Sequence, residues 1–142
     1  AWCHYDNDNK YDTIYGKLYN WYAVETSKLC PTGWHVPTDA EWTELTDYLV
    51  DQITVIAEGI ALKATSGWYD GNGTDDYGWN GLPGGKRSYV GSDYKGEYGV
   101  WWSSSKAMTG TAWNRFLYYN DDNVTRSFDY KTNGYSVRCL RD

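Results

Sequence analysis

The chain lacks a basic excess and a long apolar run. Its 19 acidic residues outnumber its 13 lysines and arginines, which gives a formal net charge of −6. Nucleic acids and anionic membrane surfaces are bound through basic patches, so this balance argues against both as partners. No apolar run approaches the roughly 18 residues of a membrane-spanning helix. Membrane insertion is therefore not predicted.

Residues of the kinds used in catalysis are scarce. The chain has two histidines, His4 and His35. The serine run that begins at Ser103 has no evident histidine and aspartate partners for a catalytic triad. His35 lies between Trp34 and Val36, where we interpret it as a hydrogen-bonded structural residue. No catalytic residue and no enzyme activity are therefore predicted.

Aromatic residues, in contrast, are abundant. Nine Trp, fifteen Tyr and two Phe make up 18% of the chain, beside one Met. Large rings can replace aliphatic side chains in the core of a loop-rich domain, and we expect most of them to do so. The remaining rings can form a rigid contact surface of the kind that tyrosine-rich paratopes use.

The apolar pattern of the 142 residues predicts one α+β domain. Helices are expected at 15–24 and 38–50, and Thr38 and Glu41 predict a capping box at the start of the second. Ile53, Ile56 and Ile60 indicate a weak further turn of helix. The segment 66–99 is expected to be a long, glycine-punctuated loop. Strands are expected at 34–36, 100–104, 112–119, 124–128 and 135–140.

The acidic loop DGNGTDD, at 70–76, is a candidate metal site. Hard Ca²⁺ ions bind several carboxylate and amide oxygens at short spacing, which makes Asp70, Asn72, Asp75 and Asp76 the candidate ligands. The match to a helix–loop–helix calcium loop is incomplete, because Gly81 stands where a closing Glu is expected. Acidic glycine-rich segments also form plain turns. A structural calcium ion is the sole cofactor predicted.

Long motifs cover nearly the whole chain. They are YDND at Tyr5, YGKLYNWYAV at Tyr15, LCPTGWHVPTDAEW at Leu29, LPGGKR at Leu82, WWSSS at Trp101, AW at Ala112 and YSVRC at Tyr135. In these motifs the chain resembles the Fibrobacter succinogenes major paralogous domain. The family's usual upstream segment is missing, so residues 1–142 are interpreted as a single domain that lacks that segment.

The segment HVPTDAEW and the terminal VRC also resemble the formylglycine-generating enzyme group, which has a C-type-lectin-like fold. The resemblance implies two helices flanking a twisted, loop-rich antiparallel sheet with the chain ends close together. Cys30 and Cys139 lie beside apolar segments that should meet there, so we predict a disulfide between them and an unpaired or intermolecular Cys3. Those enzymes use a pair of reactive cysteines, whereas Cys139 stands alone in the corresponding region.

The last third of the chain resembles the variable segments that diversity-generating retroelements rewrite in some proteins of this fold. A polar, turn-rich hairpin would have the same composition. The residues that fit are Asn114, Tyr118, Tyr119, Asn120, Asp121, Asp122, Asn123, Thr125, Asp129, Tyr130 and Asn133. Under either interpretation, these residues offer hydrogen-bonding groups and flat rings, which suit the recognition of varied ligands.

Ligand recognition through the C-terminal polar and aromatic loops is the expected function. Strand alternation should turn some of the apolar residues Phe116, Leu117, Val124 and Phe128 towards the core. One solvent-facing surface is expected from Trp113, Asn114, Tyr119, Asn120, Asp121, Asn123, Arg126, Asp129 and Tyr130. The ligand is a protein or a glycan. The Glu-Pro-Asn and Gln-Pro-Asp triplets of calcium-dependent lectins are absent, which leaves stacking on exposed Trp as the route to a sugar.

Two other functions stay open. The domain could be a structural or adhesive module that self-assembles through Cys3 and its aromatic surface, or a catalytic relative of the formylglycine-generating enzymes. Members of the resembled family occur on secreted and surface-attached bacterial proteins and in phage-like genomes. The resemblance therefore implies an extracellular, cell-surface or virion-surface location.

Overall fold

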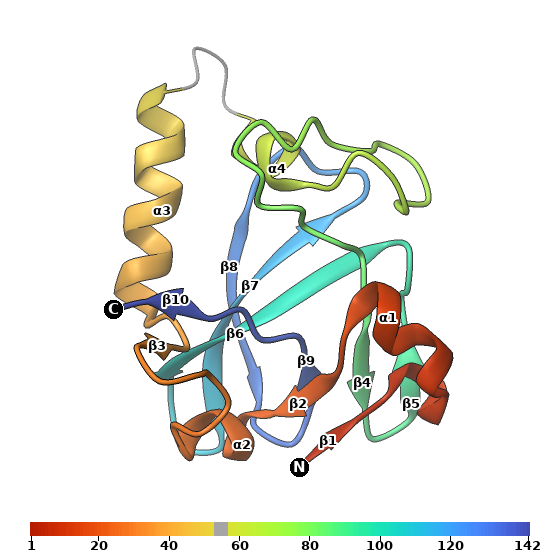
Figure 1. Cartoon of the computed structure of the whole chain (residues 1–142), viewed down its shortest axis with the longest axis vertical. Coiled ribbons are helices and arrows are strands. Elements are labelled where there is room, and N and C mark those ends of the chain that lie inside the picture. The colour runs from red at the N-terminus through yellow and green to blue at the C-terminus, as the bar shows by residue number, and fades with distance from the viewer. Residues whose placement is uncertain (53–56) are drawn as a thin grey trace.

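The computed structural model describes residues 1–52 and 57–142, which form an α+β domain of short helices, one long helix and antiparallel sheets (Figure 1). The helices are α1 (Asp12–Tyr15), α2 (Trp21–Glu25), α3 (Asp39–Gln52) and α4 (Glu58–Leu62), preceded by 3-10 turns at Tyr5–Asn7 and Asn9–Tyr11. The strands are β1 (Trp2–Cys3), β2 (Leu18–Asn20), β3 (Trp34–His35), β4 (Lys86–Ser88), β5 (Gly91–Asp93), β6 (Tyr98–Lys106), β7 (Thr111–Tyr118), β8 (Thr125–Tyr130), β9 (Gly134–Tyr135) and β10 (Leu140–Arg141). The predicted α+β class is confirmed. None of the helices in these two ranges is long and apolar enough to cross a bilayer.

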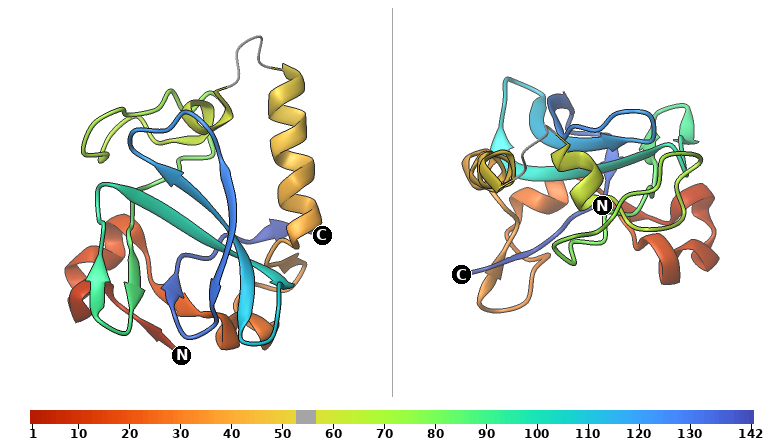
Figure 2. Two further views of the ribbon diagram at one scale, coloured as in Figure 1. Left: turned by 180° about the vertical axis from the view of Figure 1, so that it is seen from behind. Right: turned by 90° about the horizontal axis from the view of Figure 1, so that it is seen from above.

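Three antiparallel sheets are present in the described part of the chain. The largest has the order β1-β2-β9-β4-β5, the central sheet the order β6-β7-β8, and β10 pairs with β3. Figure 2 shows the central sheet crossing the middle of the molecule with α3 standing along one side. Because β2 pairs with β9, and β3 with β10, the first and last parts of the chain hold each other in place.

Helix α3 begins as its sequence predicts. The Thr38 N–H donates to Glu41 Oε2 at 2.8 Å, and the Glu41 N–H donates to Thr38 Oγ1 at 3.2 Å, which forms the expected capping box. Trp42 and Leu49 lie on the buried face of the helix. The helix runs to Gln52, two residues beyond the predicted end.

The helix predicted at 15–24 is wrong. Gly16, with φ +73°, ends α1 in the left-handed region, and the chain then continues as strand β2. Leu18 pairs with Cys3 and Tyr19 pairs with Tyr135, so sheet pairing overrides the apolar helical stripe. Asn20 then caps α2 by accepting the Ala23 N–H at 3.2 Å.

The other element predictions are of mixed accuracy. β3, β6, β7 and β8 lie where strands are expected, with shifted ends. The single strand predicted at 135–140 is wrong, because β9 and β10 join two different sheets. The looped segment 66–99 contains the β4–β5 hairpin, which was not predicted. Ile60 lies in α4, whereas Ile53 and Ile56 fall outside the described residues.

Two hydrophobic cores lie on opposite faces of the central sheet. Trp101 of β6 belongs to the core beneath α3, with Trp42, Leu49 and Leu117. Its neighbour Trp102 belongs to the other core. The buried members of that second core also include Trp21, Val24, Val36, Val100, Ala112 and Tyr135. Successive strand residues point to opposite faces, so one dipeptide contributes to both cores.

A disulfide joins Cys30 to Cys139, with their Cα atoms 5.7 Å apart, as predicted. It lies beside the β3–β10 pair, in which Trp34 is opposite Arg141. Cys3 is a free, partly buried cysteine, as expected. The bridge and the strand pair together hold the C-terminal segment against the start of α3, as the position of the C-terminus in Figure 1 shows.

Replacing both bridged cysteines with Ala should lower the free energy of unfolding by about 2–5 kcal/mol, because a closed loop of this length strongly restricts the unfolded chain. Denaturant unfolding of Cys30→Ala/Cys139→Ala measures the change. Cys3→Ala is the matched control and should have little effect. An unchanged double variant would show that strand pairing alone holds the chain ends.

Candidate functional site

The residues predicted to bind ligand do not form one surface. Trp113 pairs with Phe128 and Ala112 pairs with Asp129 in the β7–β8 ladder. Directly paired residues share a face of the sheet, and adjacent residues alternate between faces. Trp113, Arg126 and Tyr130 therefore lie on the α3 side, and Asn114 and Asp129 lie on the opposite side. The β7–β8 connection carries the remaining four, Tyr119, Asn120, Asp121 and Asn123.

An aromatic–arginine patch occupies the α3 side of β7 and β8, and consists of Trp113, Arg126, Phe128 and Tyr130. The Arg126 guanidinium carbon lies 3.4 Å from the centre of the Trp113 ring, and the Phe128 ring meets the Trp113 ring edge-on at 5.5 Å. Phe128 is 45% exposed and Tyr130 is 68% exposed. Of the four apolar residues considered for the core, Leu117 is buried, whereas Phe128 faces solvent.

Helix α3 leaves this end of the sheet uncovered. Its first residue, Asp39, contacts Arg115 and Arg126, and its later residue Leu49 packs in the same core as Leu117. The helix therefore runs away from Phe128 and Tyr130 along the strands. The uncovered rings form an apolar surface with a fixed cation at its edge.

Asp39 holds the Arg126 guanidinium in place. Arg126 donates from Nε and from a terminal nitrogen to both carboxylate oxygens of Asp39, at 2.8–3.1 Å. Arg115, which is only 2% exposed, donates to Asp39 Oδ1 at 2.6 Å and to Thr43 at 2.9 Å. Burial alone would raise the pKa of Asp39, but the hydrogen bonds from Arg126 and Arg115 outweigh it and lower that pKa.

The opposite face of the sheet holds a polar cleft of about 290 Å³, which Asn114, Ser127, Asp129 and Tyr135 help to line. Asn114 is 2% exposed, so the expectation that it faces solvent is wrong. Asp129 accepts a hydrogen bond from the buried Tyr135 hydroxyl. Burial and this carboxylate both raise the pKa of Tyr135. Asp129 therefore supports the second core rather than the predicted surface.

The β7–β8 connection is tied down by Lys63. This lysine is 1% exposed, and its Nζ donates to the carbonyl oxygens of Asp121 at 2.7 Å and of Tyr119 at 3.3 Å. Burial lowers the pKa of Lys63, and nearby acidic residues partly offset this. The Tyr119 ring packs edge-on against Tyr69 at 5.5 Å, so it is half-buried rather than a free contact residue.

Helix α4 provides the second attachment. The Gly59 N–H donates to the Asp122 carbonyl at 2.8 Å, and the Val124 N–H donates to the Glu58 carboxylate at 3.1 Å. A Cβ on Gly59 would lie 2.6 Å from the Asn123 carbonyl oxygen, so only glycine permits this approach. Asn120 and Asn123 are exposed, and Asp121 is half-buried.

The candidate calcium ligands bond mainly to nearby backbone. Asp70 accepts the Gly71 N–H, Asn72 accepts the Trp68 N–H, and Asp75 accepts the Asn80 N–H. Asp76 is exposed. Among the residues that the structure describes, no three carboxylate, histidine or cysteine side chains are placed to share a metal ion. Calcium binding stays a prediction.

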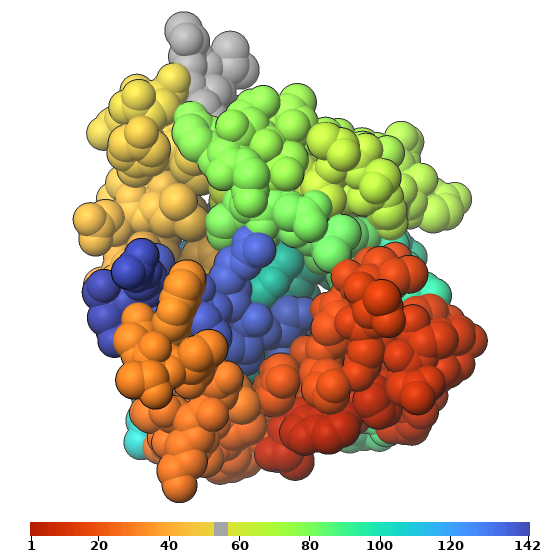
Figure 3. All heavy atoms as spheres, in the orientation of Figure 1, coloured from red at the N-terminus to blue at the C-terminus, as the bar shows by residue number. Residues whose placement is uncertain are grey.

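An aromatic groove beside the disulfide was not predicted. It has a volume of about 430 Å³ and lies between α3, the C-terminal segment and the loop at 77–79 (Figure 3). Its walls include Trp34, Leu45, Tyr77, Trp79 and Leu140, and its charged residues are Glu41 and Arg138. The buried Trp42 ring also lines it, and the Trp42 indole N–H has no hydrogen-bond acceptor within the described ranges.

The sequence contained one signal for this groove. Pairing Cys30 with Cys139 implies that Trp34 and Arg138, which lie close to these cysteines in sequence, also lie near each other. Nothing in the sequence indicated that Tyr77 and Trp79 would form a wall of the groove. They lie in a loop whose course depends on tertiary packing.

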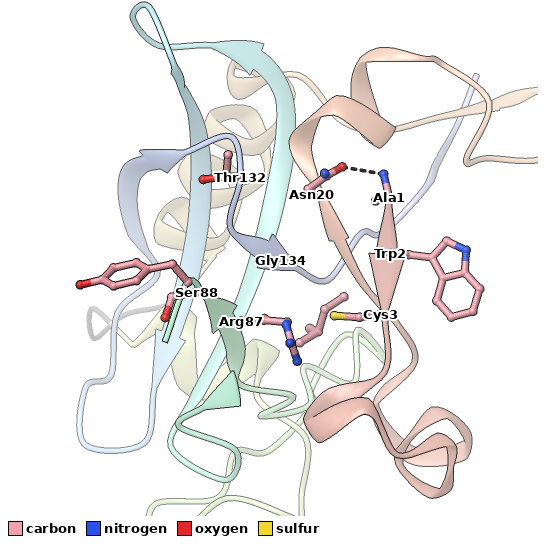
Figure 4. Close-up of a pocket in the computed structure, with 10 residues that line it drawn as sticks. Ala1, Trp2, Cys3, Asn20, Arg87, Ser88, Thr132 and Gly134 are labelled. Carbon is pink, nitrogen blue, oxygen red and sulfur yellow. Dashed lines mark hydrogen bonds between the residues drawn. The ribbon is translucent and has the colours of Figure 1, made fainter. Parts of the chain in front are cut away.

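A shallower pocket of about 250 Å³ lies at the start of the chain. Figure 4 shows Cys3 and Arg87 at this pocket, while the Trp2 ring points away from it. Burial raises the pKa of the Cys3 thiol, and Arg87 lowers it only in part. A thiol whose pKa is raised in this way is protonated at neutral pH, in contrast to an activated nucleophile.

The histidines contact carboxylates. His4 Nδ1 lies 2.7 Å from Asp12 Oδ1, and His35 bridges Glu41 at 2.9 Å and Asp142 at 2.6 Å. The hydrogen bonds to Asp142 and Glu41 raise the pKa of His35. His35 is thus hydrogen-bonded, as predicted, and its two partners make it a link between α3 and the C-terminal segment.

Comparison with known proteins identifies one family. The Fibrobacter succinogenes major domain (Fib_succ_major) matches residues 1–141. No curated protein and no solved structure matches the chain.

Asp39→Asn should lower the free energy of unfolding by about 3 kcal/mol, because it leaves the Arg115 charge buried without its partner. Chemical denaturation measures this, and Asp47→Asn on the exposed face of α3 is the control. Since the pKa of Asp39 is lowered on folding, its contribution is present above roughly pH 3.9 and is lost as the pH falls through the folded pKa. Equal stabilities for both variants would contradict the role of Asp39.

The contribution of His35 should have the opposite pH dependence. Its pKa is raised on folding, so its stabilisation is complete below the unfolded value of roughly 6.5 and is lost as the pH rises through the folded pKa. The stability difference between the wild type and His35→Gln should therefore shrink on going from about pH 5.5 to about pH 8.5. Asp142→Asn should weaken this pH dependence. A pH-independent difference would show that the ring acts through packing alone.

Proposed function

The chain belongs to the Fibrobacter succinogenes major domain family, and from this premise we propose that it is a ligand-recognition domain displayed outside the cell. The observation that supports this most strongly is the aromatic–arginine patch. It offers uncovered rings at one end of a rigid sheet, beside an arginine that two carboxylate oxygens hold in place. The ligand is a protein or a glycan.

The composition of the patch suits binding. Trp, Tyr and Arg are the residues most enriched where alanine substitution weakens protein interfaces. Asp39 and the Trp113 ring fix Arg126 before any ligand arrives, which reduces the conformational entropy lost on binding. The patch therefore provides contact area while little side-chain conformational entropy is lost on binding.

An extracellular, cell-surface or virion-surface location is part of the proposal. The Cys30–Cys139 disulfide supports it, because such bridges persist mainly in oxidising compartments. We further propose that the α+β domain is a C-type-lectin-like fold. The pairing of β3 with β10 supports this, since it brings the C-terminal strand back to the strand that precedes α3, beside the disulfide. Diversification of the C-terminal region stays a prediction.

The patch can be tested with a triple variant, Arg126→Gln/Phe128→Ala/Tyr130→Ala. The wild type and this variant are each incubated with a glycan array and with an extract of surface proteins. The extract comes from the source cells or from a neighbouring microbial community. We expect the wild type to retain a ligand that the variant does not. Binding of one partner should weaken by about tenfold or more, as when hot-spot residues are lost.

The matched control is Tyr89→Ala, which removes a ring that is 99% exposed and lies outside the patch. Tyr130→Ala should change the free energy of unfolding by less than about 0.5 kcal/mol, whereas Tyr119→Ala should lower it by about 1–3 kcal/mol because its ring is packed. If the triple variant keeps every ligand, the patch is not the binding surface. If the wild type forms a dimer that the triple variant does not, the patch is a self-assembly contact instead.

A further inference from the structure

The groove beside the disulfide is enclosed by rings on several sides. Trp34 and Tyr77 are about half exposed at its rim, and Trp42 and Trp79 meet edge-on, with their ring centres 5.9 Å apart. Its volume of about 430 Å³ lies in the range of small-molecule sites in proteins. The walls therefore suit an apolar or aromatic group about the size of a large side chain.

Among the residues that the structure describes, Arg138 is the one cation that lines the groove, and it forms no ion pair. It donates to the Trp79 carbonyl, and its guanidinium carbon lies 4.5 Å from the centre of the Trp79 ring. No carboxylate of the described residues lies within 4.0 Å of it. Burial lowers the pKa of this guanidinium, and the nearby Asp75 offsets the effect only in part. An anion in the groove would therefore meet a partly desolvated cation.

Glu41 lines the same groove but does not balance Arg138. Its Oε1 faces His35 Nε2 at 2.9 Å, and its Oε2 accepts the Thr38 N–H and hydroxyl at 2.8 Å. Both oxygens are thus committed to the capping box and to the histidine. The remaining Arg138 N–H groups are left to a ligand, and a planar guanidinium binds a carboxylate through two parallel hydrogen bonds.

We propose that this groove binds the C-terminal residue of a peptide, with its free carboxylate on Arg138 and its aromatic or aliphatic side chain between the rings. A sugar would bring many hydroxyl groups into a groove whose lining, apart from Arg138 and the committed Glu41, is mainly apolar. The mixture of one cation with aromatic walls fits a carboxylate on an apolar body better.

The groove and the aromatic–arginine patch are separate sites. Helix α3 lies between them: Asp39 and Thr43 contact the arginines on the sheet side, whereas Glu41 and Leu45 line the groove. The inference therefore does not rest on the proposed function of the patch, and each can fail without the other.

The test uses a fluorescently labelled hexapeptide that ends in Phe with a free carboxylate, and the same peptide with an amidated end. Fluorescence polarisation should show binding of the free acid that is about tenfold or more tighter than that of the amide, as expected for a lost charge-assisted hydrogen bond. Arg138→Gln should weaken binding of the free acid by a similar factor and should remove the preference for it. Tyr77→Ala should weaken both peptides at an unchanged melting temperature, because its ring is exposed at the rim.

Tyr89→Ala is the control and should bind the peptide as the wild type does, because this exposed ring does not line the groove. If Arg138→Gln does not fold, the comparison of acid with amide on the wild type and on Tyr77→Ala decides the question. Equal affinity for both peptides, or no binding at about 1 mM, would overturn the proposal. Displacement of the peptide by a glucuronate oligosaccharide but not by an unlabelled free-acid peptide would also overturn it, in favour of an acidic sugar.

Discussion

The alternation of Trp101 and Trp102 on strand β6 is the constraint on which the rest of the structure depends. Adjacent strand residues must point to opposite faces, so the two indoles are committed to different cores. Truncation of such a buried ring typically costs about 3–5 kcal/mol, a large part of the stability of a single domain. Helix α3 covers one indole, and α2 with Tyr135 covers the other. The central sheet is therefore the middle layer of the domain, with no face left entirely to solvent.

This layering explains where large side chains remain uncovered. Helix α3 starts beside Arg115 and runs away from Phe128 and Tyr130, so the rings at that end of the sheet have no cover. On its other side, the same helix forms one wall of the groove that contains Arg138. Both surfaces carry an arginine stacked on a tryptophan, but only Arg126 forms an ion pair within the described residues, with the Asp39 carboxylate that it shares with Arg115. The two surfaces therefore differ in how far the protein itself pairs their arginine.

Apart from the Cys30–Cys139 disulfide, the features that the sequence predicts best are those that local chemistry decides. The capping box at Thr38 and Glu41 involves residues three positions apart, and it forms as expected. The segment at 15–24 has an apolar helical stripe, yet its middle residues pair with Cys3 and Tyr135, which no local pattern reveals. The predicted surface placed Trp113 with Asn114, although the period of a strand separates neighbours. The alternation of strand residues can be predicted from the sequence. The exposure of Phe128, in contrast, depends on which part of the sheet α3 covers.

The hydrogen bonds that Lys63, Gly59 and Glu58 make to the β7–β8 connection reach only its main chain. Lys63 bonds to two carbonyl oxygens, Gly59 to a third, and Glu58 to an amide, and none of these contacts uses a side chain of the connection. These contacts do not depend on the side chains at the exposed positions Asn120 and Asp122. Substitutions there would alter the chemistry at the loop surface while these hydrogen bonds to the backbone stay in place. At these two positions the loop is a main-chain scaffold whose exposed side chains can be exchanged without refolding the domain.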